Sequence, residues 1–445
     1  MFKTLKNAWR IPELKKKLLF TMLIIVLYRL GANIPVPYVN PDNFKQASDL
    51  FSGTILQYLN ILSGEALGKA TLLALGVSPY ITASIVMQLL TIAIPPLERL
   101  SKDGENGRKK ITAITRVVTV ALALVTSIGY AMFLANNDLL IDFAGITESG
   151  KPSFFHYAII VACYCAGAAL VMWLAEKIND HGIGNGISII LFANIIAGFY
   201  SMFLSIWSLA TSEKLHMAVG ISLAVFEVLI LVGMIMLIVW MSDAERRIPI
   251  QYAKRVVGRK MYGGQNTNLP IKVNMSGVMP IIFANSIVAI PATITSFMSK
   301  ENWFTKFVEN VFNYNTWPYL IVFLILLIAF AYFYVAISFN PVEVANNIKN
   351  NGGAIPGIRS GRPTVEFIKK VLNRITLVGA LLVAFIACFP MIVHIITGYF
   401  EATKDLFAAL AFSGSSMMIV VGVALETTRE LEAQMSLRNY KGFLD

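Results

Sequence analysis

The side chains that could carry out chemistry in this chain are few and scattered. Its four histidines lie far apart, and no His-Glu-x-x-His motif is present to hold zinc. Residues 64–70 resemble a phosphate-binding loop, but three residues instead of four separate the glycines, and Ala70 stands where Ser or Thr would hold magnesium. The sequence therefore predicts no catalysis, no cofactor and no metal site.

Two ionisable side chains lie inside long apolar stretches. Glu227 is a functional candidate by default, because a charge within a bilayer is costly, but its sequence neighbours supply no evident cation. A glutamate that is shielded from lipid or paired with a partner chain is the alternative. Arg29 lies near the outer half of the first apolar stretch, and its side chain could extend toward the membrane interface. No pair of aspartates lies in these stretches, which argues against an intramembrane aspartyl protease.

The composition is that of a membrane protein. Of the 445 residues, 56% are hydrophobic and 14% are charged, with a mean hydropathy of +0.65, whereas a soluble domain carries about a quarter charged residues. The three cysteines lie in apolar stretches and are predicted to pack as small hydrophobic side chains. Six basic residues precede the first stretch and no small-residue cleavage site follows it, so no cleavable signal peptide is predicted.

Ten apolar stretches are long enough to cross about 30 Å of hydrocarbon. They cover residues 18–36, 71–95, 111–135, 154–175, 186–209, 217–241, 273–297, 317–339, 373–397 and 407–426. An even number of crossings places both termini on one side, and 29 of the 37 lysines and arginines lie on that side. Because basic residues concentrate in cytoplasmic loops, we expect both termini in the cytoplasm. The predicted units are the N-terminus (1–17), two halves (18–209 and 210–426) and a cytoplasmic tail (427–445).

Two of these stretches are interrupted in the same way, one in each half of the chain. Residues 76–83 and 277–284 share Gly, Val, Pro, Ile and Ala at identical offsets. A broken helix is tolerated in a membrane where protein or a water-filled cavity satisfies the freed backbone groups. Paired breaks in two halves of one chain therefore indicate where a substrate passes.

Aliphatic residues follow these breaks at helical spacing. Ile81 and Ile85 are four residues apart and share a helix face, and Ile282 holds the position equivalent to Ile81. Such residues usually pack against lipid or in a core. A ring of them also forms a narrow constriction that can seal around a bulky, variable cargo without offering a ligand to an ion. The ring candidates are Ile81, Ile85, Ile187, Leu191, Ile282 and Ile419.

Uncharged polar residues follow the two breaks on the same helices. They are Ser84, Gln88, Asn285 and Ser286. Polar contacts between helices in lipid contribute only about 1 kcal/mol each, so these residues could form a seam at which helices part. A secondary transporter for small solutes, which also uses repeats and broken helices, is the alternative function. It would need charged groups at the midplane, for which Glu227 is the one candidate.

Two loops on the cytoplasmic side, 242–272 and 340–374, exceed the ordinary connection length. Their basic residues could serve only to fix the orientation of the chain, or they could form a docking surface for an acidic or RNA-bearing partner. The length of the loops favours docking. The docking candidates are Arg246, Arg247, Lys254, Arg255, Arg259 and Arg359.

An external segment joins the first two stretches. Residues 54–64 within it are too short to cross a membrane and too apolar for a solvated loop. A re-entrant helix fits this pattern best, and an amphipathic helix at the interface is the alternative.

Motifs along nearly the whole chain resemble those of the SecY family of protein-conducting channels. ALGVSPYITASIVMQLL at 74–90 looks like the second-helix signature of that family, and WLAEKINDHGIGNGISII at 173–190 looks like its second signature. Further matches lie at 104–110, 252–255, 269–274, 339–341 and 356–359. Several motifs in the right order make a chance likeness improbable.

The resemblance implies an all-α integral membrane fold with ten transmembrane helices. Two pseudo-symmetric five-helix halves would surround an hourglass pore, closed by a short re-entrant plug helix near 55–70. The implied plug residues are Leu62, Ser63, Gly64 and Leu67. The ring candidates would form the pore constriction. The lateral gate would lie between the second and third helices and the seventh and eighth, where the polar seam residues are found.

The implied function is that of the pore-forming subunit of a preprotein translocase. Such a subunit is a gated, passive channel that passes unfolded secretory polypeptides with a signal sequence across the bacterial plasma membrane. It also releases signal sequences and transmembrane segments sideways into lipid. The implied partners are the SecE and SecG subunits, the SecA ATPase or a translating ribosome as the motor, anionic phospholipid, and YidC or SecDF as accessories. Arg359 is a particular candidate for motor docking.

Three departures from the family pattern are present. Leu191 stands at a ring position where isoleucine is expected. The plug region carries Glu65, Gly68 and Lys69 where a less charged and bulkier pattern is expected, and Glu227 is unexpected in a sixth helix.

Overall fold

The computed structural model is predominantly helical. It describes residues 2–40, 55–141, 152–211, 217–252, 255–257, 260–262, 266–295, 302–313, 316–398 and 413–441. The helices are α1 (Phe2–Arg10), α2 (Pro12–Gly31), α5 (Ile55–Ser63), α6 (Ser78–Ala93), α7 (Pro95–Lys102), α8 (Gly104–Asn136), α9 (Phe154–His181), α10 (Gly186–Ala210), α11 (Met217–Asp243), α12 (Met279–Thr295), α13 (Trp303–Phe312), α14 (Trp317–Ser338), α15 (Pro341–Asn350), α16 (Arg362–Gly398) and α18 (Ser413–Lys441).

Each of the ten predicted crossings overlaps one of these helices. Six helices in the described part of the chain are long and apolar enough to span a membrane, and a seventh span results if α6 and α7 are joined across their 102° bend. Of the remaining three, α2 and α18 carry several charged residues, and α12 has 17 residues. The predicted helical membrane fold is confirmed, and the full count of ten crossings stays a prediction.

The two interrupted helices begin in the same way. Gly76 and Gly277 have φ values of 55° and 62°, a left-handed conformation that glycine adopts readily. Two residues after each glycine a helix starts, α6 at Ser78 and α12 at Met279, with proline as its second residue. Proline suits a helix start because it has no N–H and a fixed φ. The repeated motif thus produces the same local structure in both halves.

Two small sheets, which the sequence did not predict, lie in the long loops. β1 (Glu245–Tyr252) pairs antiparallel with β4 (Asn266–Lys272) and with β5 (Gly353–Ala354), while β2 (Arg255–Val257) pairs with β3 (Lys260–Tyr262). Ile248 and Ile250 alternate with exposed residues and are buried against residues of α15 and α16. The two long loops therefore form one packed structure rather than separate flexible links.

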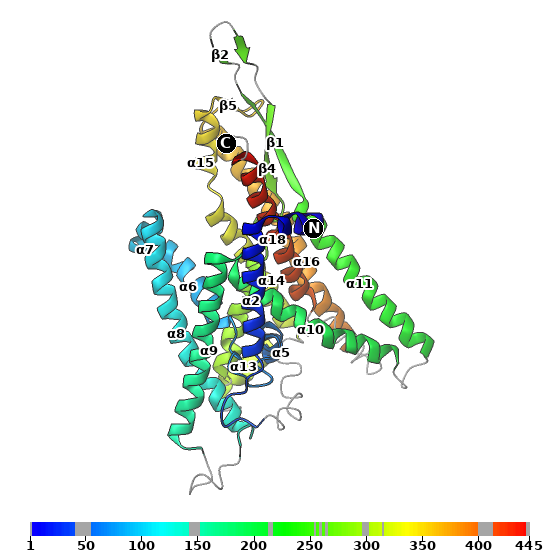
Figure 1. The fold of residues 1–445 in the computed structure, drawn as a ribbon. Coiled ribbons are helices and arrows are strands. Elements are labelled where there is room, and N and C mark those ends of the chain that lie inside the picture. The colour runs from blue at the N-terminus through cyan, green and yellow to red at the C-terminus, as the bar shows by residue number, and fades with distance from the viewer. Residues whose placement is uncertain are drawn as a thin grey trace.

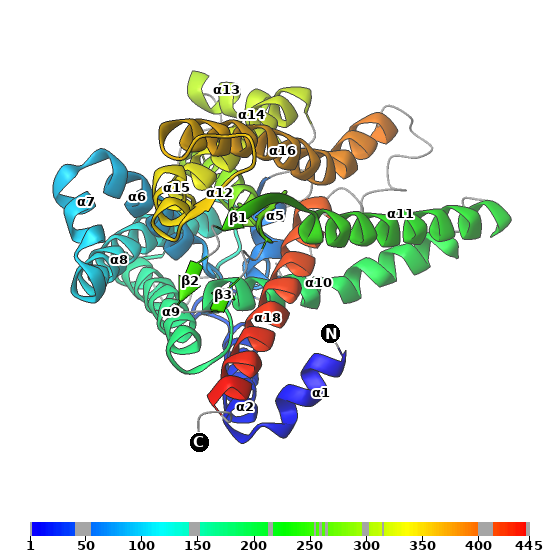
Figure 2. The ribbon, with the colours of Figure 1, turned by 90° about the horizontal axis from the view of Figure 1, so that it is seen from above.

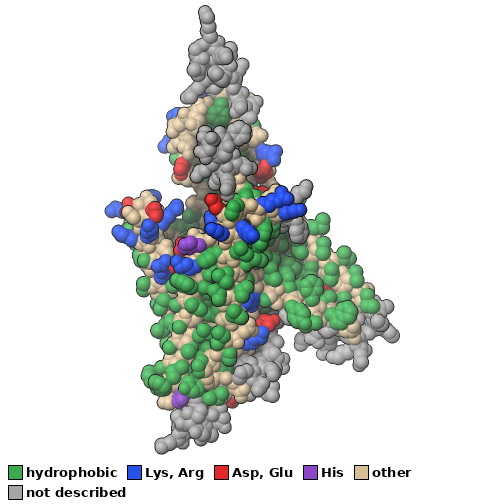
Figure 3. Space-filling model, in the orientation of Figure 1, with side chains coloured by type: hydrophobic (Ala, Val, Ile, Leu, Met, Phe, Trp, Pro, Cys, Tyr) green, Lys and Arg blue, Asp and Glu red, His purple; other side chains and the backbone are tan. Residues whose placement is uncertain are grey.

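The figures show how the helices and the sheet are arranged. Most long helices run roughly side by side, and the sheet with β1, β4 and β5 rises from one end of them, where the N-terminus and the end of α18 also lie (Figure 1). Seen from above, α10 and α11 extend together away from the other helices (Figure 2). Hydrophobic side chains cover the middle of the molecule, and Lys and Arg gather above them near α7 and the N-terminus (Figure 3).

Candidate functional site

The ring candidates come together in one apolar cluster. Ile85, Leu191 and Ile419 are at most 2% exposed, Ile81 and Ile282 are also buried, and Ile187 is half-buried against the same cluster. They come from α6, α10, α12 and α18, so both halves of the chain contribute. Their place in one apolar cluster agrees with a ring, and the role of these residues as a pore constriction stays a prediction.

A cavity of about 350 Å³ lies beside this cluster and falls within the size range of small-molecule sites, roughly 300–1,000 Å³. Four ring candidates line it: Ile81, Leu191, Ile282 and Ile419. Plug and gate candidates line it as well, namely Leu62, Leu67, Asn285 and Ser286, together with α8 residues that include Leu122 and Val125. Among the described residues on its wall none is charged. The ring candidates, the plug candidates and residues of α8 and α12 therefore share one apolar cavity.

The four gate candidates do not share one environment. Asn285 is 2% exposed, and neither atom of its amide has a hydrogen-bond partner in the described part of the chain. Ser286 donates from Oγ to the carbonyl of Ile282 at 2.8 Å. Ser84 is half-buried and Gln88 is exposed, and neither lines the cavity. The structure thus brings Asn285 and Ser286 to the cavity but not Ser84 and Gln88.

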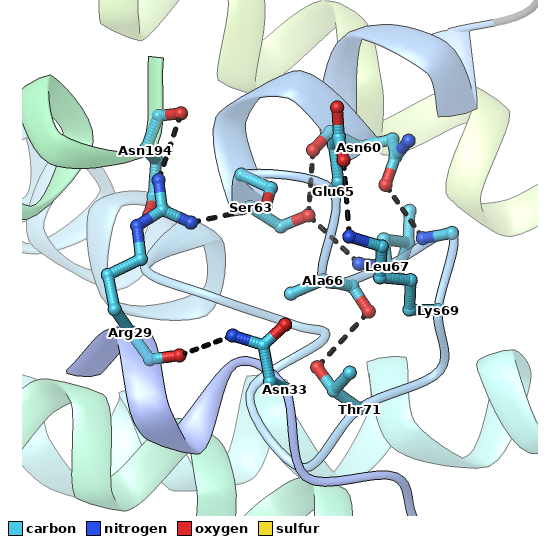
Figure 4. Close-up of polar contacts among 12 residues, drawn as sticks. Arg29, Asn33, Asn60, Ser63, Glu65, Ala66, Leu67, Lys69, Thr71 and Asn194 are labelled. Atoms are coloured by element: carbon cyan, nitrogen blue, oxygen red, sulfur yellow. Dashed lines mark hydrogen bonds and ion pairs between the residues drawn. The ribbon is translucent and has the colours of Figure 1, made fainter. Parts of the chain in front are cut away.

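The plug segment folds back on itself after α5 (Figure 4). Ser63 donates from Oγ to the carbonyl of Asn60 at 2.9 Å and accepts from the backbone N–H of Leu67 at 3.0 Å, and Asn60 Oδ1 accepts from the N–H of Gly68 at 2.7 Å. Gly64 has a φ of 67°, which favours glycine. Ser63 and Leu67 are buried, and α5 contacts α10 and α12. This packing within the protein favours the re-entrant helix over the interfacial one.

The unexpected residues of the plug region have local explanations. A Cβ atom at position 68 would lie 3.0 Å from Nδ2 of Asn60, so a side chain there would require Asn60 to shift. Lys69 Nζ lies 3.2 Å from Glu65 Oε2 as an exposed i,i+4 pair, which contributes about 0.3–0.5 kcal/mol. The charges therefore lie on the outside of the turn and do not disturb its packing.

Arg29 does not extend to the interface as the sequence analysis suggested. Its guanidinium donates to three backbone carbonyls: Nη1 to Gly64 at 3.3 Å, and Nη2 to Ala193 at 2.6 Å and Asn194 at 3.2 Å (Figure 4). The prediction was wrong because the carbonyl partners lie on α10 and the plug segment, far along the chain. The position of an arginine inside an apolar stretch was the feature of the sequence that marked Arg29 as unusual. Nothing in the sequence around Asn194 indicated that it would be a partner of Arg29.

Glu227 lies on α11 and is 1% exposed, and its Oε1 has no hydrogen-bond partner among the described residues. It does not line the cavity. This placement agrees with a glutamate shielded from lipid, and it lends no support to a transporter site at the cavity.

The docking candidates lie at the sheet end of the molecule. Arg246 and Arg247 are exposed on β1, and Arg247 Nε donates to Glu245 Oε1 at 2.6 Å. Arg359 is exposed in the turn between β5 and α16. Arg255 lies on β2, whereas Lys254 and Arg259 lie outside the described residues. β1 pairs with β5, so the structure joins the two loops that carry these residues.

Known proteins resemble this chain over its full length. A model of the SecY family matches residues 71–428. The chain is 45% identical over 453 residues to the protein translocase subunit SecY of Streptomyces coelicolor, with 100% of both chains covered. It is 39% identical over 445 residues to the protein translocase subunit SecY of Thermus thermophilus, with 100% of this chain and 98% of the relative covered.

Solved structures share the fold. A SecY structure described as showing that the plug domain stabilises the closed state of the translocation channel matches with a TM-score of 0.60 and 18% identity, covering 96% of each chain. Sec61 in the canine ribosome-channel complex matches with a TM-score of 0.56 and 16% identity, covering 95% of this chain and 96% of that one. The chain therefore belongs to the SecY family of protein translocase subunits, which form a protein-conducting channel in the membrane and are not enzymes.

Proposed function

We propose that an unfolded polypeptide crosses this channel through the constriction formed by Ile81, Ile85, Ile187, Leu191, Ile282 and Ile419. The observation that carries the proposal is the cavity that four of these side chains share with the plug segment and with α12. A narrow aliphatic constriction excludes water and ions. The constriction offers no fixed polar ligand to an ion, so it can seal around passing side chains of any type.

A signal sequence or transmembrane segment leaves sideways between α6 and α8 on one side and α12 and α14 on the other. The support is the wall of the cavity, where α8 contributes Leu122 and Val125 and α12 contributes Ile290 and Ile294. An apolar helix that enters between these residues buries its own apolar surface, which is favourable at roughly 25 cal/mol per Å². Ion or small-solute transport would instead need charged groups at this place.

Asn285 is predicted to lower the stability of the closed gate. A buried amide without partners costs about 1–3 kcal/mol, and a leucine of similar size removes this cost. We expect Asn285→Leu to raise the melting temperature of the complex and to slow export of a protein with a weak signal sequence by about tenfold. Ser286→Ala is the matched control, because Ser286 already bonds the carbonyl of Ile282. Equal export by Asn285→Leu and wild type would contradict the role of Asn285 in the gate.

The plug is the segment from α5 to residue 70, with Leu62, Ser63, Gly64 and Leu67 at its centre. Leu62 and Leu67 line the same cavity as Ile282 and Leu191, which supports a role for the segment as a stopper against the constriction. Its movement away from the ring opens a continuous path for the chain in transit.

The basic residues at the sheet end dock the motor, which is the SecA ATPase or a translating ribosome. Arg246, Arg247 and Arg359 are exposed on elements joined by β1–β5 pairing, and exposed arginines suit acidic or RNA-bearing surfaces.

SecE and SecG complete the complex, anionic phospholipid surrounds it, and YidC or SecDF assist it. The channel lies in the bacterial plasma membrane. The sheet and both termini lie in the cytoplasm, because basic residues gather at the end of the molecule that carries them.

The test of this function is export by purified components. The chain is reconstituted with SecE and SecG in vesicles that contain anionic lipid, and SecA, ATP and an unfolded preprotein are added. Protection of the preprotein from external protease, dependent on ATP and on its signal sequence, is expected. Uptake of small solutes without protection of the preprotein would favour the transporter alternative.

A further inference from the structure

We propose that Arg29, together with Asn194 and Tyr28, is a latch that holds the plug in its closed position. The inference rests on the proposed function, because a latch matters only if plug movement opens the channel. Arg29 and Tyr28 belong to α2 and Asn194 to α10, so the latch fixes the plug to two helices of the N-terminal half.

The latch acts on the backbone of the plug at the carboxyl end of α5. The last carbonyls of a helix have no partner within the helix. The turn after α5 satisfies two of them itself, since Gly64 N–H donates to the carbonyl of Ile61 and Glu65 N–H donates to that of Asn60. The carbonyl of Leu62 is satisfied from the channel wall instead, by Asn194 Nδ2 at 2.7 Å.

The remaining bonds tie the same residues together. Asn194 Nδ2 also donates to the hydroxyl oxygen of Tyr28 at 2.9 Å, and Tyr28 is fully buried. Arg29 joins the carbonyl of Gly64 in the plug to the carbonyls of Ala193 and Asn194 in α10. A cation at the carboxyl end of a helix is also favoured by the helix dipole. One guanidinium thus bridges plug and channel wall, which a lysine with its single point charge cannot do in the same way.

The geometry leaves room for this contact only if position 64 is glycine. A Cβ atom there would lie 2.6 Å from Arg29 Nη1 and 3.0 Å from Asn194 Oδ1. Any side chain at this position therefore displaces the latch. On its other side the plug lines the cavity with the apolar side chains of Leu62 and Leu67, and the carbonyl of Leu67 accepts a hydrogen bond from the hydroxyl of Tyr130 on α8. Release of the plug from the N-terminal half therefore requires the Arg29 and Asn194 bonds to break, together with the bond from Tyr130.

The experiment compares Arg29→Met and Arg29→Lys with wild type in the complete complex with SecE and SecG. Arg29→Met removes the equivalent of one hydrogen bond to a charged group. This loss shifts the equilibrium between the closed and open states of the channel about tenfold to a hundredfold. We expect Arg29→Met to raise the resting ion leak in planar bilayers by about tenfold, with a smaller rise for Arg29→Lys. We also expect Arg29→Met to export a preprotein whose signal sequence is weakened.

A disulfide provides the rescue that separates a latch from a merely structural role. Cβ of Ser63 lies 3.6 Å from the position of a Cβ atom at Gly76, within the disulfide range of about 3.5–4.5 Å. Ser63→Cys and Gly76→Cys are added to Arg29→Met, and also to the chain with Arg29 intact, after alanine replaces the three native cysteines. The second variant controls for the strain of a side chain at Gly76, whose φ is 55°. Oxidation is expected to abolish the leak and reduction to restore it. A leak that oxidation leaves unchanged, or an Arg29→Met complex that seals like wild type while wild type exports normally, overturns the latch. Failure of the wild-type complex to export would count against the proposed function instead.

Discussion

Serine at both Ile81 and Ile282 is expected to make the resting channel conduct ions. Both side chains are buried, both line the cavity, and they come from opposite halves of the chain at equivalent positions of the repeated motif. Each removed apolar side chain contributes about 1.5–3 kcal/mol of burial, and 1.4 kcal/mol is a factor of ten in an equilibrium. The resting conductance of the double variant should rise by about tenfold or more in planar bilayers.

The matched control places the same change where it cannot affect the constriction. Ile128 on α8 and Ile325 on α14 are 40% and 59% exposed on the outside of the protein. Serine at both of these positions should leave the conductance at the wild-type level. Assembly with SecE is measured for both variants, because a buried Ile→Ser change also lowers the free energy of unfolding. A tight seal in an assembled Ile81→Ser, Ile282→Ser complex would remove these residues from the constriction.

Reversing the charge of Arg359 is expected to block motor-driven export while the complex stays assembled. The turn that carries Arg359 is held firmly: Ile355 is buried, Ile358 N–H donates to its carbonyl, and Thr364 Oγ1 donates to the Arg359 carbonyl at 2.8 Å. The side chain itself is exposed, so its replacement should change the free energy of unfolding by no more than about 0.5 kcal/mol.

A like charge placed at a docking surface costs several kcal/mol, so Arg359→Glu should lower SecA-driven export about tenfold or more. The measurement is the export rate at increasing SecA concentration, and the variant should need far more SecA. Lys349→Glu on α15 is the control, because Lys349 is also exposed at this end of the molecule and is not a docking candidate. Normal export by Arg359→Glu would show that the motor docks elsewhere.

The sequence predicted most of the helices because hydrophobic length and Gly-Pro breaks are local signals. The breaks at Gly76 and Gly277 produce matched helix starts, and the aliphatic residues behind them are buried in one apolar cluster. The same signals placed the re-entrant segment, since residues 54–64 are too short to cross and too apolar for a solvated loop.

The features that the sequence did not predict depend on distant partners. The hydrogen bonds of Arg29 reach Asn194 and Gly64, which lie 165 and 35 residues away along the chain. The sheet was missed because Pro249 interrupts the pattern of Ile248 and Ile250, and proline argues against a strand. β1 tolerates Pro249 because only β4 pairs with β1 at that residue, whereas β5 pairs with Gln251 and Tyr252. Ser84 and Gln88 were grouped with Asn285 by position along the helix, yet they do not line the cavity.

Contact between the constriction and a polypeptide in transit tests the account most directly. A single cysteine is placed at Ile81 or Ile282, or at exposed Ile128 as a control, in a chain whose native cysteines are replaced by alanine. A preprotein with one cysteine is stalled during SecA-driven export, and disulfide formation is measured. We expect crosslinks from Ile81 and Ile282 and none from Ile128. A stalled chain that is protected from protease, yet crosslinks to neither residue, would contradict it.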